Sequence, residues 1–440
     1  MSTKKVLFVP YSVFLLVAST LIGGVIESVV LFLTYVISVV FIFNRGTLSD
    51  PRMLFLGLFF FYSTWYSIRV VLLNYSVLEI DLLILKQSVN YSFLAAVTFV
   101  VVANAIIDES VNNKRIKFFE WARGKTNFFL SEKLVLVILI LINAFILFTV
   151  LTSGATSKIG ISKPLKLTGS FSTIFLTVIF ALRLLRLKKS LYRDSFIVYL
   201  SLFMLLFVLV LGERDALFRI LFLFVVVFFD KNQKGSPLIL MMVLITVAIL
   251  VPISQAFKAV TMSGELNLPK FGYAMIFSNE FISASRNLYS LMLYEVEHNF
   301  MFLYTDLLRA VSPTFLLSDL NVFSSTQWFN GTFRVVNGFS GTSGWGFGIV
   351  AQGFLLGGGA GVIVVMTLFS SIICFFYNQR FNSIYFYIFY LLMLTTAIYC
   401  IRADMANFIS QSFKISGLMI MLVILGHELF KSKYMPNNDL

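Results

Sequence analysis

The sequence predicts an all-α, polytopic transmembrane bundle with about twelve membrane-spanning helices and one large outer loop that contains amphipathic helices. Of the 440 residues, 59% are hydrophobic and 12% are charged, whereas a soluble domain carries about 25% charged residues. The apolar residues also come in runs of about 18 to 22, the length of helix that crosses a hydrocarbon core of about 30 Å. We expect these runs to be helices, because backbone exposed to lipid must satisfy its own hydrogen bonds.

Each span is placed on an apolar run that ends at a polar or basic stretch. The predicted spans lie near residues 6–24, 26–43, 54–73, 88–107, 133–153, 171–188, 195–211, 216–230, 237–255, 347–376, 384–401 and 409–430. The chain thus divides into 1–255 with the first nine spans, 256–346 as the large outer loop, and 347–440 with the last three spans and a short tail.

The basic residues predict how these spans are oriented. With the N-terminus inside, more than half of the 34 Lys and Arg residues fall in the connections on one side, which the positive-inside rule identifies as the cytoplasm. Both chain ends are then cytoplasmic, and the basic loops agree with a bacterial inner membrane. The net charge of +13 is therefore a signal of topology and not of binding to nucleic acid. The turn 212–215, the loop 256–346 and the turn 402–404 all open on the outer face.

The large outer loop contains two amphipathic stretches, 277–297 and 301–311, which are rich in Phe, Tyr, Leu and Met. Such helices lie along a membrane surface or cap a bundle. After them, residues 338–361 contain ten glycines, several at a spacing of four. This pattern is typical of close helix packing, and the alternative is a hinge or a backbone that approaches a ligand.

Two arginines in separate outer turns, Arg214 and Arg402, are the first candidates for function. A charge at the edge of a bilayer is costly unless it is paired or faces water. The guanidinium group is planar, permanently charged and bidentate, so two of them at the outer mouth suit a diphosphate. The alternative is a structural role, in which Arg214 pairs with Asp404 or Glu213.

The large outer loop carries further polar candidates, among them Glu280, Arg286, His298 and Arg334. A general base for chemistry could be His298, Glu280 or Glu295, and the alternative for each is ordinary solvation in a loop.

Two helical spacings in this loop give more specific expectations. Tyr294 and His298 are predicted to share a helical face at i, i+4, and Asp306 is predicted to pair with Arg309 at i, i+3.

Several classes of site are absent from the sequence. It contains no GxxxxGK[ST] loop and no HExxH motif, so we expect neither a metal nor a cofactor. Cys374 and Cys400 both fall inside apolar runs and are expected to be packing residues. If the chain catalyses a reaction, the energy must arrive with the substrate, as it does in a sugar carried on a lipid diphosphate.

Three segments carry a resemblance to a known family. They are Gly-Glu-Arg-Asp at 212–215, the run from Ser-Arg-Asn-Leu-Tyr at 285–289 through Ser-Pro at 312–313, and Ile-Arg-Ala-Asp at 401–404 with the Phe-Ile-Ser-Gln that follows at 408–411. With the helical layout, they resemble the Wzy-type polymerases of O-antigen and other polysaccharide repeat units. Members of that family carry a small or hydroxyl residue before the first arginine, so the role of Glu213 here is open.

The resemblance implies a glycosyltransferase at the periplasmic face of the inner membrane, which joins oligosaccharide units carried on undecaprenyl diphosphate. It implies that Arg214 and Arg402 bind the donor diphosphate and that the loop around Glu280, Arg286 and His298 shapes the acceptor site. We expect Glu280 and His298 as catalytic candidates and Arg334 as a further substrate-binding residue. The expected partners are the lipid-linked oligosaccharide, the bilayer and a regulator of polysaccharide chain length.

Three rival functions fit parts of the same pattern. A lipid-linked oligosaccharide flippase also needs arginines for a diphosphate, but it would have two similar halves and short loops on both faces. An O-antigen ligase shares the outer loop and the arginines, and it transfers finished polymer. An ion-coupled transporter would need acidic residues in mid-membrane, of which the predicted spans contain almost none.

Overall fold

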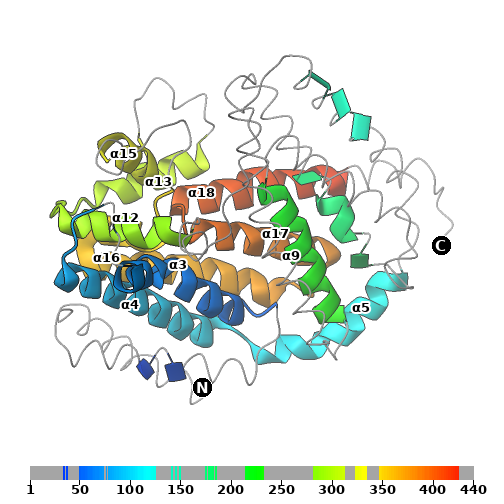
Figure 1. Ribbon diagram of the computed structural model, residues 1–440. Helices are drawn as coiled ribbons and strands as arrows, with labels where there is room; N and C mark the ends of the chain where they lie inside the picture. Colours follow the sequence, from blue (N-terminus) through cyan, green and yellow to red (C-terminus); the bar gives the residue numbers. More distant parts are fainter. Residues whose placement is uncertain are drawn as a thin grey trace. The chain divides into compact units, whose positions relative to one another are not determined.

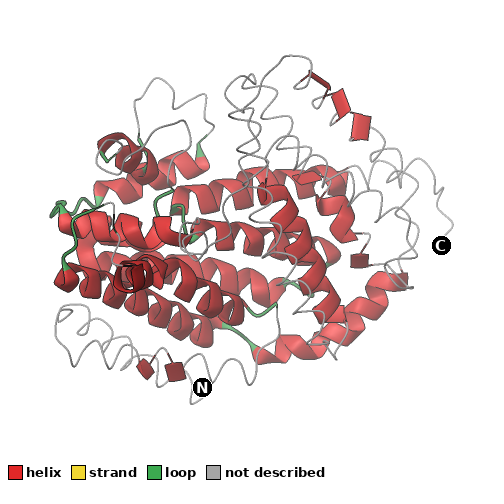
Figure 2. Cartoon of the chain, in the orientation of Figure 1, coloured by secondary structure: helices red, strands yellow, loops and turns green. Residues whose placement is uncertain are grey.

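The computed structural model describes residues 49–73, 76, 78–124, 214–231, 281–312, 323–333 and 346–425, with short stretches between 33 and 37, 140 and 149, and 174 and 185. Most of this part of the chain is helical, and no strand occurs within it (Figure 2). The predicted all-α class is therefore confirmed for the described residues.

The helices follow the chain in the order shown in Figure 1. They are α3 Pro51–Leu73, α4 Leu82–Ile106, the short 3-10 helix η1 Glu109–Lys114, α5 Arg115–Gly124, α9 Arg214–Lys231, α12 Phe281–Leu293, α13 Met301–Val311, α15 Ser325–Thr332, α16 Ile349–Gln379, α17 Ile384–Cys400, α18 Met405–Ile409 and its π-helical continuation η5 Ser410–Gly417.

Three helical segments are long and apolar enough to cross a membrane. They are Leu82–Ile106, Ile349–Gln379 and Met405–Leu425, and each coincides with a predicted span. A chain that spans the membrane is thereby supported. The number of about twelve spans stays a prediction, because several of the predicted spans lie wholly or partly outside the described residues.

The chain forms two compact units that interleave along the sequence. The first unit consists of Met1–Glu109, Phe271–Asn378 and Thr396–Lys414. The second consists of Ser110–Lys270, Gln379–Thr395 and Ile415–Leu440. All described residues of the large outer loop predicted at 256–346 thus belong to the first unit.

Hydrogen bonds at one end of the first unit set the direction of its helices. Arg52, at the start of α3, donates from Nη1 to Asn104 Oδ1 near the end of α4 at 2.6 Å, so the two helices run antiparallel. Asn378, near the end of α16, donates from Nδ2 to the carbonyl oxygen of Ile106 at 2.8 Å. The second half of α16 therefore runs parallel to α4. We call this end of the unit, with Arg52, Asn104 and Asn378, the Arg52 end.

Helix α12 lies at the opposite end of α3 and packs along α3 and α4 (Figure 1). Residues 282–291 of this helix are all buried. Ser285 Oγ accepts a hydrogen bond from the Tyr66 N–H at 3.2 Å, and Tyr289 donates its hydroxyl to the Glu79 carbonyl at 2.6 Å. Of the two placements predicted for this stretch, along a membrane surface or as a cap on the bundle, the buried polar contacts of α12 favour packing against the bundle.

The glycine-rich helix α16 is two helices joined by a sharp bend. Gly357 and Gly358 have non-helical backbone angles, and Gly358 has a φ of 58°, which favours glycine. A Cβ on Gly353 would lie 2.6 Å from the Cα of Val362, although a straight helix would hold residues nine apart at about 13 Å. The first half of α16 therefore folds back against the second half. The span predicted as one helix at 347–376 is corrected accordingly.

The close packing predicted from the glycine pattern is confirmed in α16, while the alternative of a hinge or a backbone that approaches a ligand stays a prediction. Gly353 and Gly361 allow close packing, while Gly358 supplies the bend. Residues 359–379 continue as helix for about 31 Å. That length is sufficient to cross a bilayer core without the first half.

In the described part of the second unit, an aromatic cluster lies beside polar contacts made by two buried charged residues, Asp230 and Arg380. The rings of Phe118, Phe381 and Tyr387 pack within 6 Å of one another. Tyr387 donates its hydroxyl to Asp230 at 2.8 Å, and Arg380 donates to Asn112 Oδ1 at 2.7 Å. Each of these charged side chains is buried with a polar partner, as an apolar interior requires.

Substitution Gly361→Ala is expected to destabilise the protein. The added Cβ would lie 2.1 Å from the backbone carbonyl oxygen of Gly353, so the two halves of α16 must separate, at a cost of about 1 to 3 kcal/mol. Thermal unfolding in detergent should show a lower midpoint. Gly331→Ala in α15 is the matched control, because a Cβ there meets nothing within 4 Å. Equal midpoints for the two variants would contradict the close packing.

Candidate functional site

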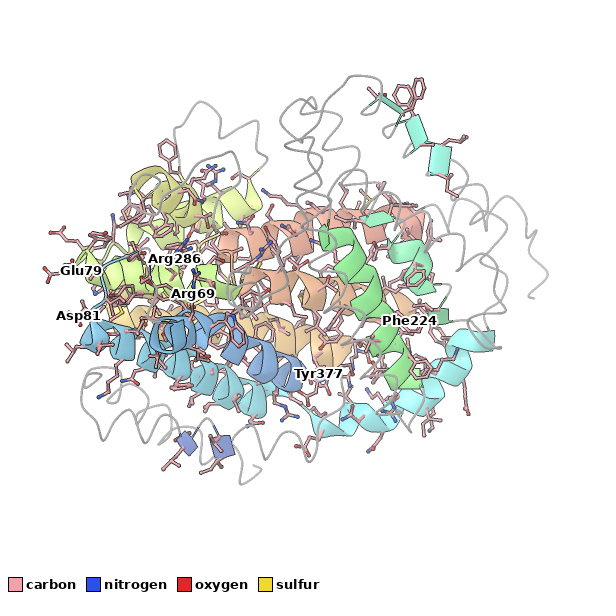
Figure 3. All side chains as sticks on the ribbon, viewed as in Figure 1. Arg69, Glu79, Asp81, Phe224, Arg286 and Tyr377 are labelled. Carbon is pink, nitrogen blue, oxygen red and sulfur yellow. The ribbon has the colours of Figure 1, made fainter. Side chains whose placement is uncertain are left out.

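Two arginines from different helices lie together where α12 crosses α3. Arg286 on α12 is only 2% exposed, and its neighbour is Arg69 on α3 (Figure 3). The pKa of Arg286 is lowered to about 9, chiefly because the side chain is buried; Tyr66 raises this pKa and the positive charge of Arg69 lowers it. Arg286 remains protonated at neutral pH, so the structure holds two cationic guanidinium groups close to one another.

Asn287 connects this arginine pair to the segment that precedes α16. Its Nδ2 donates to the carbonyl oxygens of Gly346 and Phe347, each at 3.1 Å. Arg286 donates from Nη2 to Asn287 Oδ1 at 3.3 Å. The amide of Asn287 thus holds the guanidinium of Arg286 on one side and the backbone at 346–347 on the other.

The same backbone segment holds the turn that carries Arg402. The N–H groups of Phe347 and Gly348 donate to the carbonyl oxygens of Arg402 and Ala403 at 2.9 and 3.1 Å. Gly346 has a φ of 71°, and a Cβ there would lie 2.4 Å from the Arg402 carbonyl oxygen, so only glycine allows this approach. Arg402 and Arg286 are therefore joined through one short backbone segment.

The side chain of Arg402 is half-buried and lies over an aromatic ring. Its guanidinium carbon is 4.9 Å from the centre of the Tyr399 ring, a cation–π geometry that orients the group. Arg402 lies in the turn between α17 and α18. An arginine held in this way at a helix junction is suited to bind an anionic group.

His298 lies in the connection between α12 and α13 and not on a helix. Helix α12 ends in a Schellman motif, in which the Val296 N–H donates to the Leu291 carbonyl at 3.0 Å and Glu295 adopts a φ of 46°. The prediction that Tyr294 and His298 share a helical face is therefore wrong, because the helix ends before Tyr294.

The exposed ring of His298 packs against the bend of α16. It makes an edge contact with Phe354 at 4.9 Å between ring centres, and a Cβ on Gly358 would lie 3.2 Å from its Nε2. The imidazole is open to solvent and backed by the two halves of α16. It therefore keeps the access that a general base needs.

Two carboxylates of the first unit are fully buried, Asp306 on α13 and Asp404 before α18. Asp306 accepts a hydrogen bond from the Ser325 N–H at 2.9 Å and others from the Ser325 hydroxyl and the Gln352 amide. Asp404 accepts from the Thr326 hydroxyl. Adjacent residues at the start of α15 thus bind the two carboxylates.

The carboxylate of Asp306 lies at the start of α15, where it accepts from the Ser325 N–H, and Asp404 lies at the start of α18. Backbone N–H groups at the start of a helix favour a negative charge. Asp404 caps α18 by accepting from the Asn407 N–H at 2.7 Å. The pKa of Asp306 is nevertheless raised from 3.8 to about 7, first by burial and next by the charge of Asp404, while the bonds from Ser325 and Gln352 oppose the rise. Asp306 therefore gains a proton as the pH falls through about 7.

The predicted pairing of Asp306 with Arg309 is wrong. The carboxylate of Asp306 is taken up by Ser325 and Gln352, which lie on the buried side of α13. The Arg309 carbonyl instead accepts from Lys414 Nζ at 2.8 Å, and Lys414 also donates to the Ser312 carbonyl. Lys414 thus caps the end of α13 and fixes it to η5.

The sequence candidates fall into two groups. Arg286, Arg402 and His298 lie in the first unit, and the contacts of Asn287 join the two arginines. Arg214 begins α9 in the second unit, and nothing is described of its side chain. Glu280 and Arg334 lie outside the described residues.

Sequence reasoning missed two residues that the structure brings to this site. Arg69 stands inside the apolar run predicted at 54–73, and a charge within a span is a signal of function or pairing. Gln352 is the one amide side chain in the apolar stretch 347–376, where a polar group needs a partner. Neither signal identifies the residue that Arg69 or Gln352 meets, because Arg286 and Asp306 lie far away in the sequence.

Comparison with known proteins gives no relative for this chain. No family model matches it, and neither a curated protein nor a solved structure does.

The raised pKa of Asp306 predicts how stability depends on pH. The folded protein holds a proton on Asp306 that the unfolded chain releases near pH 3.8, so stability falls as the pH rises from about 4 to about 7 and then levels off. Between pH 5.5 and 7 this one group contributes about 2 kcal/mol. The apparent unfolding midpoint in detergent should rise by a few degrees from pH 7 to pH 5.5.

Asp306→Asn serves as the reference for this pH effect. It removes the titrating group, so its midpoint should change less over the same interval. The other charged groups remain in both proteins, namely Arg309 on the same helix and Asp404 and Lys414 on the neighbouring segments. An identical pH profile for the variant and the parent would contradict the assignment to Asp306.

Proposed function

We propose that this chain is a membrane glycosyltransferase of the polymerase type, which joins oligosaccharide repeat units carried on undecaprenyl diphosphate at the periplasmic face of a bacterial inner membrane. The observation that carries this assignment is that the pair Arg69 and Arg286 and the turn that carries Arg402 meet at residues 346–347 of the first unit; we call these three residues the arginine group. Arg286 and Arg402 are joined through Asn287 and residues 346–347. Arg69 adds a second guanidinium beside Arg286.

The direction of the helices supports an outer position for this group. The Arg52 end of the first unit is opposite to α12, and Arg52 belongs to the basic connections that the charge distribution assigns to the cytoplasm. The arginine group then faces the periplasm. Lipid-linked repeat units are presented on that side, where no nucleotide is needed as an energy source.

The chemistry requires little beyond charge neutralisation and proton removal. The bond between the donor's anomeric carbon and the diphosphate oxygen breaks, and a bond forms from that carbon to a hydroxyl oxygen of the acceptor unit. The arginines stabilise the negative charge that develops on the departing undecaprenyl diphosphate. His298 is the described candidate that can take the hydroxyl proton, and Glu280 is a second candidate from the sequence.

Loss of Arg402 or Arg286 is expected to abolish long surface polysaccharide. Removing one group that stabilises the developing charge costs about 100-fold or more in rate. A bacterium lacking this gene would be complemented with the parent, Arg402→Ala, Arg286→Lys or Arg69→Ala at matched protein amounts, and its glycan sizes would be compared. Arg286→Lys keeps the buried charge but loses the bidentate fork. Arg115→Ala in α5 is the control and should restore the full ladder.

The same experiment separates the rival functions. Surface glycan with a single repeat unit in the deletion strain supports polymerisation. Lipid-linked units that remain on the inner face would instead show a flippase, and full-length polymer retained on the carrier would show a ligase. A full ladder with all three arginine variants would overturn the role of the arginine group.

A further inference from the structure

Gln352 occupies a position between the two elements that carry the buried carboxylates. It lies in the first half of α16 and is fully buried. Its Nε2 donates to Asp306 on α13, and its Oε1 accepts from the Met405 N–H, the first residue of α18, at 2.8 Å. Both polar atoms of the amide therefore have a partner. If the amide were flipped, its Nε2 would face the Met405 N–H, which is also a donor.

The two buried carboxylates, Asp306 and Asp404, connect the same elements through α15. The hydroxyl of Thr326 on α15 binds Asp404, and the N–H of the preceding residue, Ser325, binds Asp306. Helix α15 is itself fixed by a capping box between Ser324 and Gln327. Four elements, α13, α15, α16 and α18, thus meet in one closed hydrogen-bond network.

This network reaches to within two residues of Arg402. Asp404 and the Met405 N–H are its last members on that side, and the Arg402 carbonyl is held from the opposite side by Phe347. The turn 401–404 is thereby fixed at both of its ends. A polar network in an apolar interior is rigid when every member is satisfied and costly when one is lost.

We propose that Asp306 and Gln352 are positioning residues, which hold the turn 401–404 so that the Arg402 guanidinium meets the diphosphate of the substrate. This role rests on the proposed function, because it acts through Arg402. Neither residue is exposed, so neither touches the substrate. Their effect on the reaction should therefore depend on the presence of the Arg402 guanidinium.

Gln352→Met tests this dependence, because it keeps the size of the side chain and removes both hydrogen bonds. In the parent background it should lower polymer formation about tenfold or more at matched protein amounts, with a raised KM for the lipid-linked donor. In an Arg402→Lys background, which retains the charge but not the fork, it should add little further loss. Such non-additivity marks two residues that act as one unit.

An exchange of partners provides a rescue. Asp306→Asn alone places an amide N–H against the N–H of Gln352, and Gln352→Glu alone places a carboxylate against Asp306. In the double variant, the amide introduced at position 306 would donate to the carboxylate introduced at position 352, which still accepts from the Met405 N–H. Each single variant should lose polymer, and the double variant should recover most of it. This comparison needs only that the double variant accumulates to the parent's level.

The outcomes distinguish a failure of the positioning role from a failure of the proposed function. Full polymer with Gln352→Met, an additive loss in the Arg402→Lys background, or failure of the double variant to recover would each overturn the positioning role while the polymerase assignment stands. If Arg402→Lys and Arg402→Ala both give a full ladder, the proposed function of the arginine group fails first. Loss by Gln352→Met that disappears in the Arg402→Lys background, with recovery by the double variant, supports both.

Discussion

The side-chain amide of Gln352 is the contact on which the packing of α13, α16 and α18 in the first unit depends. Gln352 is fully buried in an apolar helix, so each of its polar atoms must find a partner inside the protein. It finds Asp306 on α13 and the backbone of Met405 on α18. Two elements far apart in the sequence are thereby placed by one residue, and Arg402 lies in the turn that precedes the second.

The bend in α16 makes this contact geometrically accessible. If Ile349–Gln379 were one straight helix, Gln352 would lie at the far tip of a rod about 46 Å long. Because Gly353 and Gly361 pack closely and Gly358 turns the chain, the first half instead lies against the second half. The bend also presents Phe354 and Gly358 to His298. The glycines thus combine packing with the shaping of a surface.

The buried arginines at the two ends of the first unit differ in the charged groups near them. At the Arg52 end, a cation is satisfied locally, since Arg52 binds Asp50 at 2.6 Å. At the other end, the electrostatic neighbour that lowers the pKa of Arg286 is a second cation, Arg69. Two like charges near one another in an apolar setting raise the free energy of the protein. In the proposed function, the substrate diphosphate would bring negative charge to this pair.

The sequence alone determined the helical class, the presence of membrane-spanning segments, the helix at 301–311 and the candidacy of Arg286 and Arg402. These features depend on composition, on apolar run length and on charge at helix ends, all of which are local. Only the tertiary structure decided that α12 is buried, that Asp306 binds Ser325 and Gln352 in place of Arg309, and that α16 folds back on itself. Those outcomes depend on pairings between residues far apart in the chain, and spacing along one helix carries no information about a partner on another.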